Sequence, residues 1–368
     1  MKKYLSLSLI ILVFLFTQCK PKDTGAVVIG VDLPLTGAFD YWGNEFKTGA
    51  EVFCKQHPEV KVLFEDNLSS PDEALTVAGQ LLHVEKADAL VSLFVPFSTK
   101  LRTRAESAQV PLITSFISAS DFTDGYSFCF NDFATNAMQL PLLVDCVTDS
   151  LNLHRGIYYC VNDDYGTDGA KILSQLMGAK GIALSGELFN AGTSDHRNTL
   201  AKLMKEKVDF VFLIARNRDL INAINQIRER DKDVLILGVG SFDAPEVWDG
   251  VPAASQANIL FASSYFHKDY NEESRAFYDA FYEIRRRDPN YPAVFGYTIC
   301  QYLSACITKA KEQNVPLTDI LESLDYESIR GRIRMTDNHI VYSPVAIYKR
   351  EGGVSVPIAT EMERPAQE

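Results

Sequence analysis

The chain has 368 residues, of which 46% are hydrophobic, 11% aromatic and 23% charged, and its formal net charge is −12. This composition supplies ample core for a folded chain without low-complexity segments, and the length exceeds what one hydrophobic core usually spans, which predicts two lobes. The negative charge would repel a phosphate backbone, so nucleic acid is excluded as a partner.

The N-terminal residues have the pattern of an export signal. Two lysines precede an apolar run over residues 4–16, which is too short to span a bilayer, and "FTQC" follows. The stretch resembles a bacterial lipoprotein signal, in which Cys19 is lipidated and becomes the first residue of the mature protein. The alternative is plain cleavage at a nearby site, with Cys19 lost. We expect a signal peptide over 1–18, a tether over 19–26 and no later membrane span.

Strand and helix patterns then alternate along the first third of the chain. Nearly continuous apolar runs, typical of parallel strands covered on both faces, predict strands over 26–33, 61–66, 87–94 and 110–116. The helix after the first strand carries Phe46, Ala50 and Phe53 on one stripe. Ser70 and Glu73 form a capping box that starts the next helix.

A second series of similar size begins near residue 137. It predicts helices over 137–151, 168–180, 196–206 and 218–230, and strands over 155–163, 182–189, 209–215, 234–240 and 259–266. Helices are expected over 271–287 and about 295–312, and short strands follow with turns at Asp337-Asn338 and Gly352-Gly353. Two such series predict an α/β protein of two doubly wound parallel-sheet lobes.

The order and spacing of several segments resemble the type I periplasmic binding proteins of the leucine/isoleucine/valine-binding family. These segments are "PLTGAFDYWGNEFKTGAEV", "EDNLSSPDEALTVAGQLL", "VPLITS", "VNDDYGTDGAK", "HRNTLAKLMKEKVDFVFL" and "GRIRMTDNHIVYSPVAIY". The resemblance implies two lobes joined by three crossover strands, with a ligand between them. Crossings are expected near Phe133, Phe266 and Val341. Lobe I would then comprise 27–133 and 267–341, and lobe II 134–266 and 342–368.

The loop over residues 33–43 is expected at the rim of this cleft, because ligands in open α/β sheets bind beyond the carboxyl ends of the strands. Pro34 and Gly37 shape the turn, and Gly43 starts the helix without a side chain in the way. By the resemblance, Trp42 occupies the position where an aromatic side chain closes over the ligand. The alternative is a tryptophan that only packs the helix.

A carboxylate cradle is expected in lobe I. In "VPFSTK", Ser98 and Thr99, next to Phe97, could hold a ligand carboxylate at a helix N-terminus, and one of the two hydroxyls could instead cap the helix. Ser118 falls near the position where the family places a Ser or Thr on the same carboxylate, with the backbone of Phe116 beside it. Ordinary turn serines are the alternative.

Lobe II supplies the opposite side of the expected site. Tyr165 matches the family's aromatic residue after the strand and would stack on the ligand, unless it is a packed loop tyrosine. Arg216 stands near a family position that often carries an aromatic residue, and it favours an anionic group. Gly240 and Ser241 stand where amino-acid binders place an acidic residue, and Asp243 follows. Either Asp243 reaches the ligand ammonium or the ligand is not an α-amino acid.

Together with the signal pattern, the resemblance implies a solute-binding lipoprotein of the bacterial cell envelope. Its ligand would be a small carboxylate, an amino acid first, passed to an ABC transporter permease. No G-x-S-x-G, P-loop or G-x-G-x-x-G motif occurs, so we expect no enzyme, no cofactor and no metal. Cys300 and Cys306 lie six apart in one predicted helix and are not expected to be bonded. The alternative function is a ligand-free lipoprotein that binds and regulates an envelope protein.

Overall fold

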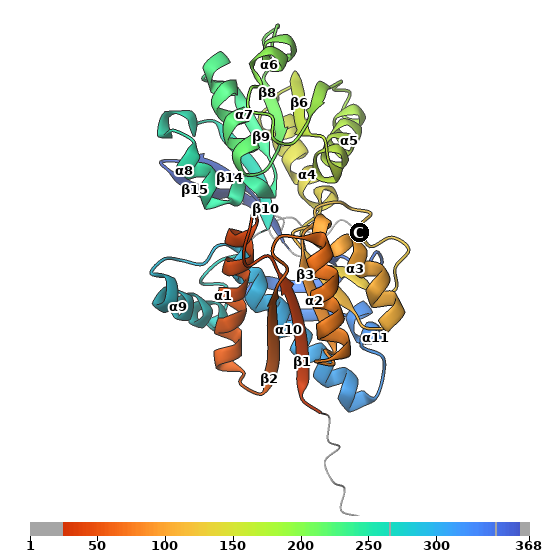
Figure 1. Cartoon of the computed structure of the whole chain (residues 1–368). Helices are drawn as coiled ribbons and strands as arrows, with labels where there is room; N and C mark the ends of the chain where they lie inside the picture. The colour runs from red at the N-terminus through yellow and green to blue at the C-terminus, as the bar shows by residue number, and fades with distance from the viewer. Residues whose placement is uncertain (1–24, 265, 343, 361–368) are drawn as a thin grey trace, which may run out of the picture.

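The computed structural model describes residues 25–264, 266–342 and 344–360, which form two lobes, one above the other in Figure 1. The predicted signal peptide, Cys19 and most of the tether lie outside the described residues, as do residues 361–368. Within the described ranges, no helix combines the length and the apolar character needed to cross a membrane.

The lower lobe, lobe I, is built on a five-stranded sheet in which all neighbouring strands are parallel, in the order β2-β1-β3-β4-β5. Its strands are β1 (Val27–Leu33), β2 (Val60–Asp66), β3 (Ala89–Leu93), β4 (Leu112–Ser115) and β5 (Cys129–Asn131), and its first helices are α1 (Asp40–Gln56), α2 (Pro71–His83) and α3 (Val95–Ala108). The backbone N–H of Glu73 donates to Ser70 Oγ at 3.4 Å, as the capping box predicts. The three-residue β5 was not predicted.

The upper lobe, lobe II, repeats this order and extends it by a hairpin. Five parallel strands run β10-β9-β8-β6-β7; β14 pairs antiparallel with β10, and β15 pairs antiparallel with β14 at the edge of the sheet. The strands are β6 (Gly156–Val161), β7 (Ser185–Phe189), β8 (Phe210–Ile214), β9 (Leu235–Gly238), β10 (Ile259–Ser264), β14 (Val345–Glu351) and β15 (Val354–Thr360). The helices are α4 (Asn136–Asp145), which continues as a π-helical turn over Cys146–Ser150, α5 (Asp164–Ala179), α6 (Arg197–Leu203), α7 (Asn217–Arg230) and α8 (Pro245–Gly250), with 3-10 turns at Gly240–Asp243 and Ala253–Ser255.

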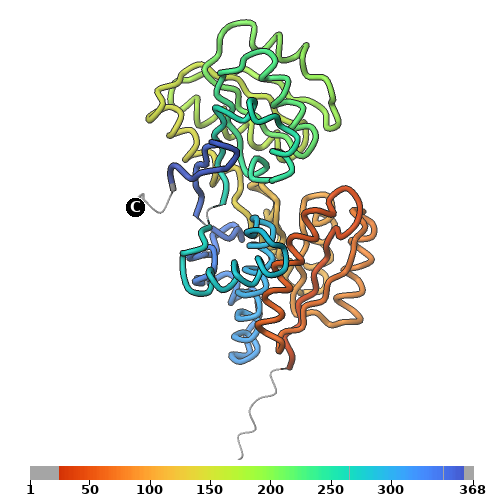
Figure 2. Tube along the Cα trace, turned by 90° about the vertical axis from the view of Figure 1, so that its left-hand side faces the viewer, coloured from red at the N-terminus to blue at the C-terminus, as the bar shows by residue number. Residues whose placement is uncertain are grey.

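The chain returns to lobe I before it ends in lobe II. This return comprises α9 (Glu272–Arg285), α10 (Tyr291–Gln313), α11 (Leu317–Glu322) and an antiparallel sheet of β11 (Asp325–Ser328), β12 (Gly331–Met335) and β13 (Val341–Tyr342). In Figure 2 the late part of the chain, coloured blue, lies in both lobes and passes between them at the waist. The predicted α/β class with two parallel-sheet lobes is confirmed. The chain changes lobe after β5, β10 and β13, and the residue limits of the lobes stay a prediction.

Close packing of α1 on α10 brings the first turns of the two helices together. A Cβ on Gly49 would lie 1.8 Å from the carbonyl oxygen of Ala293, and a Cβ on Gly296 would lie 2.0 Å from a carbonyl oxygen of α1. Only glycine therefore permits this approach. It places Trp42 beside Tyr291, with ring centroids 5.5 Å apart.

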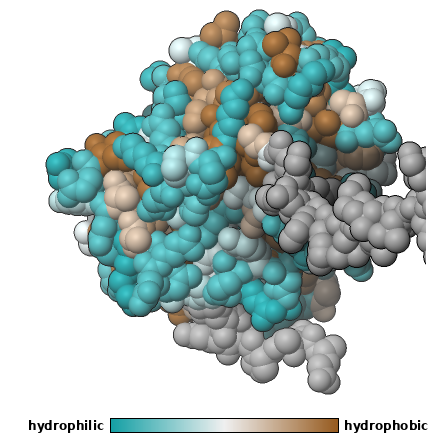
Figure 3. Space-filling model, turned by 90° about the horizontal axis from the view of Figure 1, so that it is seen from below, coloured by the Kyte–Doolittle hydropathy of each residue, from teal (hydrophilic) through white to brown (hydrophobic). Residues whose placement is uncertain are grey.

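The outer surface agrees with the charge of the chain. Seen from below, hydrophilic residues cover most of the visible face, and apolar residues occur between them in small groups (Figure 3). Cys300 and Cys306 lie buried in α10 as free thiols, as expected from their spacing.

Candidate functional site

A cavity opens between the lobes, beyond the carboxyl ends of the parallel strands, where open α/β sheets bind ligands. The space between the atoms of this inner cavity, open solvent included, amounts to about 490 Å³, and its lining consists of Phe39, Trp42, Phe94, Phe116, Ser118, Phe133, Tyr165, Arg216, Asn217, Gly240, Ser241 and Tyr291. An outer cavity of about 660 Å³ shares six of these residues and adds Val95, Pro96, Ala119, Asp163 and Asp164. Both lobes therefore contribute to one continuous cleft.

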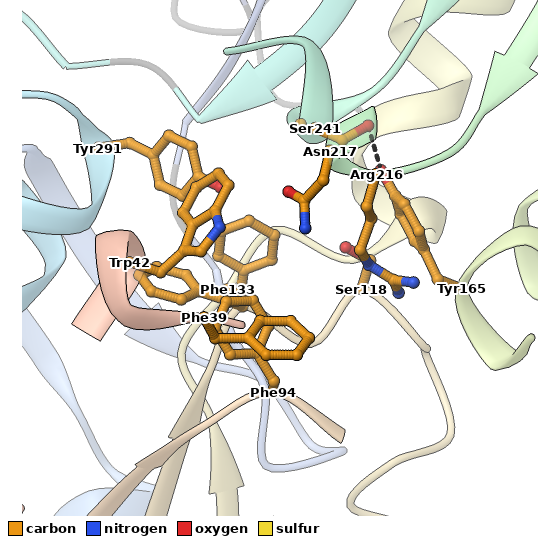
Figure 4. A pocket seen from close by; sticks show the side chains of 12 residues that line it. Phe39, Trp42, Phe94, Ser118, Phe133, Tyr165, Arg216, Asn217, Ser241 and Tyr291 are labelled. Carbon is orange, nitrogen blue, oxygen red and sulfur yellow. Dashed lines mark hydrogen bonds between the residues drawn. The ribbon is translucent and has the colours of Figure 1, made fainter. Parts of the chain in front are cut away.

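One side of the inner cavity is an aromatic wall, made of Phe39, Trp42, Phe94, Phe116, Phe133 and Tyr291. Figure 4 shows most of these rings gathered on the side of the cavity opposite Tyr165 and Arg216. Phe116 packs near the centre of the wall, with ring centroids 5.4 Å from Phe94 and 5.4 Å from Tyr291. Trp42 is only 7% exposed, so it both lines the cavity and packs against its neighbours. Packing of Trp42 is thus confirmed, and its contact with a ligand stays a prediction.

Three cavity residues have an unusual backbone. Phe94, Phe116 and Asn217 have φ of 63°, 60° and 49°, in the left-handed region that residues with a side chain seldom occupy. Such strain persists where the surrounding structure imposes it, and it concentrates at ligand sites. Its occurrence at three residues of one cavity supports a binding role for that cavity.

The other side of the inner cavity is a polar wall, made of Ser118, Tyr165, Arg216, Asn217 and Ser241 (Figure 4). The Tyr165 hydroxyl donates to Ser241 Oγ at 3.1 Å. Burial raises the pKa of Tyr165, so the phenol stays neutral. The Arg216 guanidinium lies 4.3 Å from the centroid of the Tyr165 ring and donates to the Asp163 carboxylate. The polar wall thus offers hydrogen bonds and one cation to a ligand.

The local sequence explains the position of Tyr165. Asp163 caps α5 by accepting the N–H of Gly166 at 3.0 Å, so the helix begins at Asp164, four residues before the predicted start. Tyr165 therefore lies in the first helical turn and not in a loop. A Cβ on Gly166 would lie 2.0 Å from the carbonyl oxygen of Val161, so the turn that presents Tyr165 requires glycine.

The residues of the expected carboxylate cradle lie outside both cavities, except Phe116 and Ser118. Because α3 begins at Val95, Ser98 lies inside the helix, fully buried, and its hydroxyl donates to Ser92 Oγ at 3.1 Å. Thr99 is exposed and donates to the Val95 carbonyl at 2.6 Å. The residue at the N-cap is Phe94, so neither hydroxyl caps the helix.

Phe97 and Asp243 also lie away from the cavities. Phe97 is buried behind the aromatic wall, edge-on to Phe39 with ring centroids 5.4 Å apart. The Asp243 carboxylate accepts the hydroxyl of Ser263 at 3.3 Å, and burial raises its pKa to about 6. Ser241, two residues earlier in the same 3-10 turn, faces the cavity in its place.

Five cavity residues were not predicted: Phe39, Phe94, Phe133, Asn217 and Tyr291. For Tyr291, the first residue of α10, the sequence contains a helix-start signal. Asn290 caps α10 by accepting the N–H of Ala293 at 3.3 Å, and Pro292 stands in the first turn. These two residues mark the helix start four residues before the expected one.

Within the described residues, no group of three or more His, Cys, Asp and Glu side chains is placed to hold a metal ion. The cavity instead combines aromatic surface with hydroxyl, amide and guanidinium donors. This arrangement suits non-covalent binding of a small molecule that has an apolar body and an acceptor-rich end.

Comparison with known proteins identifies the family. A family model described as periplasmic binding protein matches residues 26–353. The chain belongs to the periplasmic binding protein family. The match confirms the family resemblance seen in the sequence. It also confirms the expectation that this binding protein is not an enzyme. A search of curated proteins found no match.

Solved structures share the fold at low sequence identity. The leucine-binding protein LivK of Thermotoga maritima has a TM-score of 0.82 and 20% identity, over 91% of this chain and 98% of that chain. LivJ of Streptococcus pneumoniae, in complex with isoleucine, has a TM-score of 0.79 and 21% identity, over 91% and 99%. A solute-binding protein of Rhodopseudomonas palustris, in complex with benzoate, has a TM-score of 0.79 and 18% identity, over 91% and 96%.

Proposed function

We propose that this binding protein captures a small carboxylate with an aromatic or apolar body in the inner cavity and delivers it to an ABC transporter permease. The observation that carries the proposal is the division of the inner cavity into an aromatic wall and a polar wall that contains Arg216. A guanidinium is the side chain best suited to a carboxylate, and aromatic rings bury a flat apolar body well.

The sequence favoured an amino acid, and the cavity favours an acid without an ammonium group. Among the residues that the structure describes, no carboxylate lines the inner cavity, and Asp243, the expected partner of an ammonium, is bound to Ser263. Asp163 pairs with Arg216 and caps α5, and it lines the outer cavity without lining the inner one. A buried ammonium without a carboxylate would be costly. The benzoate complex of one structural neighbour shows that this fold accommodates such an acid.

Thermal unfolding with a ligand panel tests the proposal. The panel contains benzoate, 4-hydroxybenzoate, leucine and isoleucine, and benzamide is the neutral control matched to benzoate. A ligand at about 100 times its Kd adds roughly 2.7 kcal/mol to the stability, which raises the midpoint by several degrees. We expect benzoate or 4-hydroxybenzoate to raise it and benzamide to leave it unchanged.

Other outcomes of the panel are equally informative. A rise with leucine or isoleucine alone would replace the proposed ligand class by amino acids. If no small acid or amino acid shifts the midpoint, the regulator of an envelope protein becomes the better interpretation.

We further propose that the protein is anchored in the cell envelope through a lipid on Cys19, which lies outside the described residues. The lipobox pattern and the extracytoplasmic location implied by the family support this proposal. Cys19→Ser should abolish labelling by a fatty-acid analogue in cells, and Cys54→Ser should not. Equal labelling of the two variants would contradict the proposed lipid anchor on Cys19.

A further inference from the structure

Arg216 and Asp163 form an ion pair at the junction of the two cavities. They follow β8 and β6, which are neighbouring parallel strands, so their side chains emerge at the same edge of the sheet. An Arg216 N–H donates to the Asp163 carboxylate, and both side chains are 36% exposed. A pair this exposed contributes little to stability and can exchange partners.

The two members of the pair face different spaces. Arg216 lines both cavities, whereas Asp163 lines the outer cavity only. The bond to Asp163 uses one of the five N–H donors that a guanidinium carries. Arg216 can therefore present its other donors to the inner cavity, beside Asn217 and Ser241 of the polar wall.

In the described part of lobe I, no cationic side chain lines either cavity. The first turn of α3 contains Pro96, which lacks an N–H, and the hydroxyls of Ser98 and Thr99 bond within lobe I. Apart from Ser118, lobe I presents aromatic rings to the inner cavity. The aromatic wall therefore lies on lobe I, and the cation, Arg216, lies on lobe II.

We infer that the ligand carboxylate binds to Arg216 in lobe II, with its apolar body against lobe I, and that Asp163 is a displaceable counter-ion which competes for Arg216. The inference rests on the proposed function, because it assigns the orientation and the competitor of that ligand. In the ion pair, Asp163 neutralises Arg216. When a carboxylate enters, it takes the inward donors and Asp163 repels it, so Asp163 limits the affinity for every acid, and contact with the aromatic wall has to offset this repulsion.

Two variants test the inference by calorimetric titration with benzoate at neutral pH. Asp163→Asn removes the competing charge and keeps a residue that caps α5 as well as aspartate does. It should bind benzoate about 2- to 5-fold more tightly, the range expected for an exposed charge. Arg216→Gln should bind benzoate about 10- to 100-fold more weakly, because a hydrogen bond to a charged group is lost. Arg216→Lys should retain part of the affinity.

Asp164→Asn is the matched control, since it removes the same charge from the neighbouring residue, which lines the outer cavity without being the ion-pair partner of Arg216. It should give a smaller gain than Asp163→Asn. Equal gains would reduce the effect to general electrostatics and overturn the counter-ion role. Weaker binding by Asp163→Asn would show that Asp163 positions Arg216, which also overturns it.

The failure of the inference can be told apart from the failure of the proposed function. If the wild type and Arg216→Gln bind benzoate equally well, a carboxylate is captured but not by lobe II, and only the inference fails. If the wild type binds neither benzoate nor 4-hydroxybenzoate, both the proposed function and the inference fail. The ligand-free midpoint of each variant verifies that the variant is folded.

Discussion

Replacement of Trp42 by alanine should lower both the stability of the protein and its affinity for ligand. Trp42 lines the inner cavity, yet it is only 7% exposed and its ring lies 5.5 Å from that of Tyr291 and 6.3 Å from that of Phe116. A tryptophan buries roughly 150–250 Å², which corresponds to roughly 4–6 kcal/mol at about 25 cal/mol per Å². One face borders a cavity that water can fill, so we expect about half of this loss, roughly 2–3 kcal/mol.

The chain offers a matched control in its other tryptophan. Trp248 is 8% exposed and packs on Phe242 and Phe261 in lobe II, away from both cavities. In urea unfolding, both variants should lose stability, Trp248→Ala more than Trp42→Ala because Trp248 borders neither cavity, whereas in calorimetric titration with the acid that binds best, only Trp42→Ala should lose affinity.

Two results would refute this reasoning. A loss of stability below about 0.5 kcal/mol in Trp42→Ala would be the size of an ordinary surface change, and Trp42 would then be a wall without a packing role. If Trp42→Ala unfolds more easily but binds ligand like Trp248→Ala, the side chain belongs to the packing alone.

Three further predictions concern buried polar residues. Burial raises the pKa of Asp32 from 3.8 to about 7, so the folded state retains a proton that the unfolded chain releases. The free energy of unfolding should therefore fall as the pH rises from about 4 to 7. Urea titrations of Asp32→Asn at several pH values should lack this part of the pH dependence. Arg330 and Asp132 form a fully buried ion pair, so Arg330→Met should cost roughly 3–5 kcal/mol in urea unfolding, and a cost near zero would contradict an uncompensated buried charge. Ser118→Ala should weaken ligand binding in calorimetric titration, and Ser98→Ala should not. Equal losses of affinity would indicate that the ligand carboxylate binds at α3 of lobe I, as the sequence predicted.

The sequence predicted those site residues whose position follows from the order of strands and helices. Trp42, Tyr165 and Arg216 line the inner cavity, and the sequence indicated all three through the family resemblance. Each follows a strand of a parallel sheet, and the carboxyl ends of such strands meet at one edge. Local patterns are sufficient for such positions, because the parallel topology brings the ends of the strands together.

Residues that depend on helix starts or on distant contacts could not be placed in the same way. Ser98 was expected at a helix N-terminus, but α3 begins at Val95 after a left-handed Phe94, which no pattern in the sequence indicates. Tyr291 reaches the cavity because Gly49 and Gly296 let α1 and α10 approach closely, which is a contact between segments far apart in the chain. A single sequence does not show which distant segments pack together.

The most direct test of the central claim is a crystal structure of the protein with the acid that gives the largest thermal shift. We predict electron density in the inner cavity, with the apolar body against Trp42 and Tyr291 and the carboxylate within hydrogen-bonding distance of the Arg216 guanidinium. An empty inner cavity in the presence of saturating acid, or a carboxylate directed at the first turn of α3, would contradict the account.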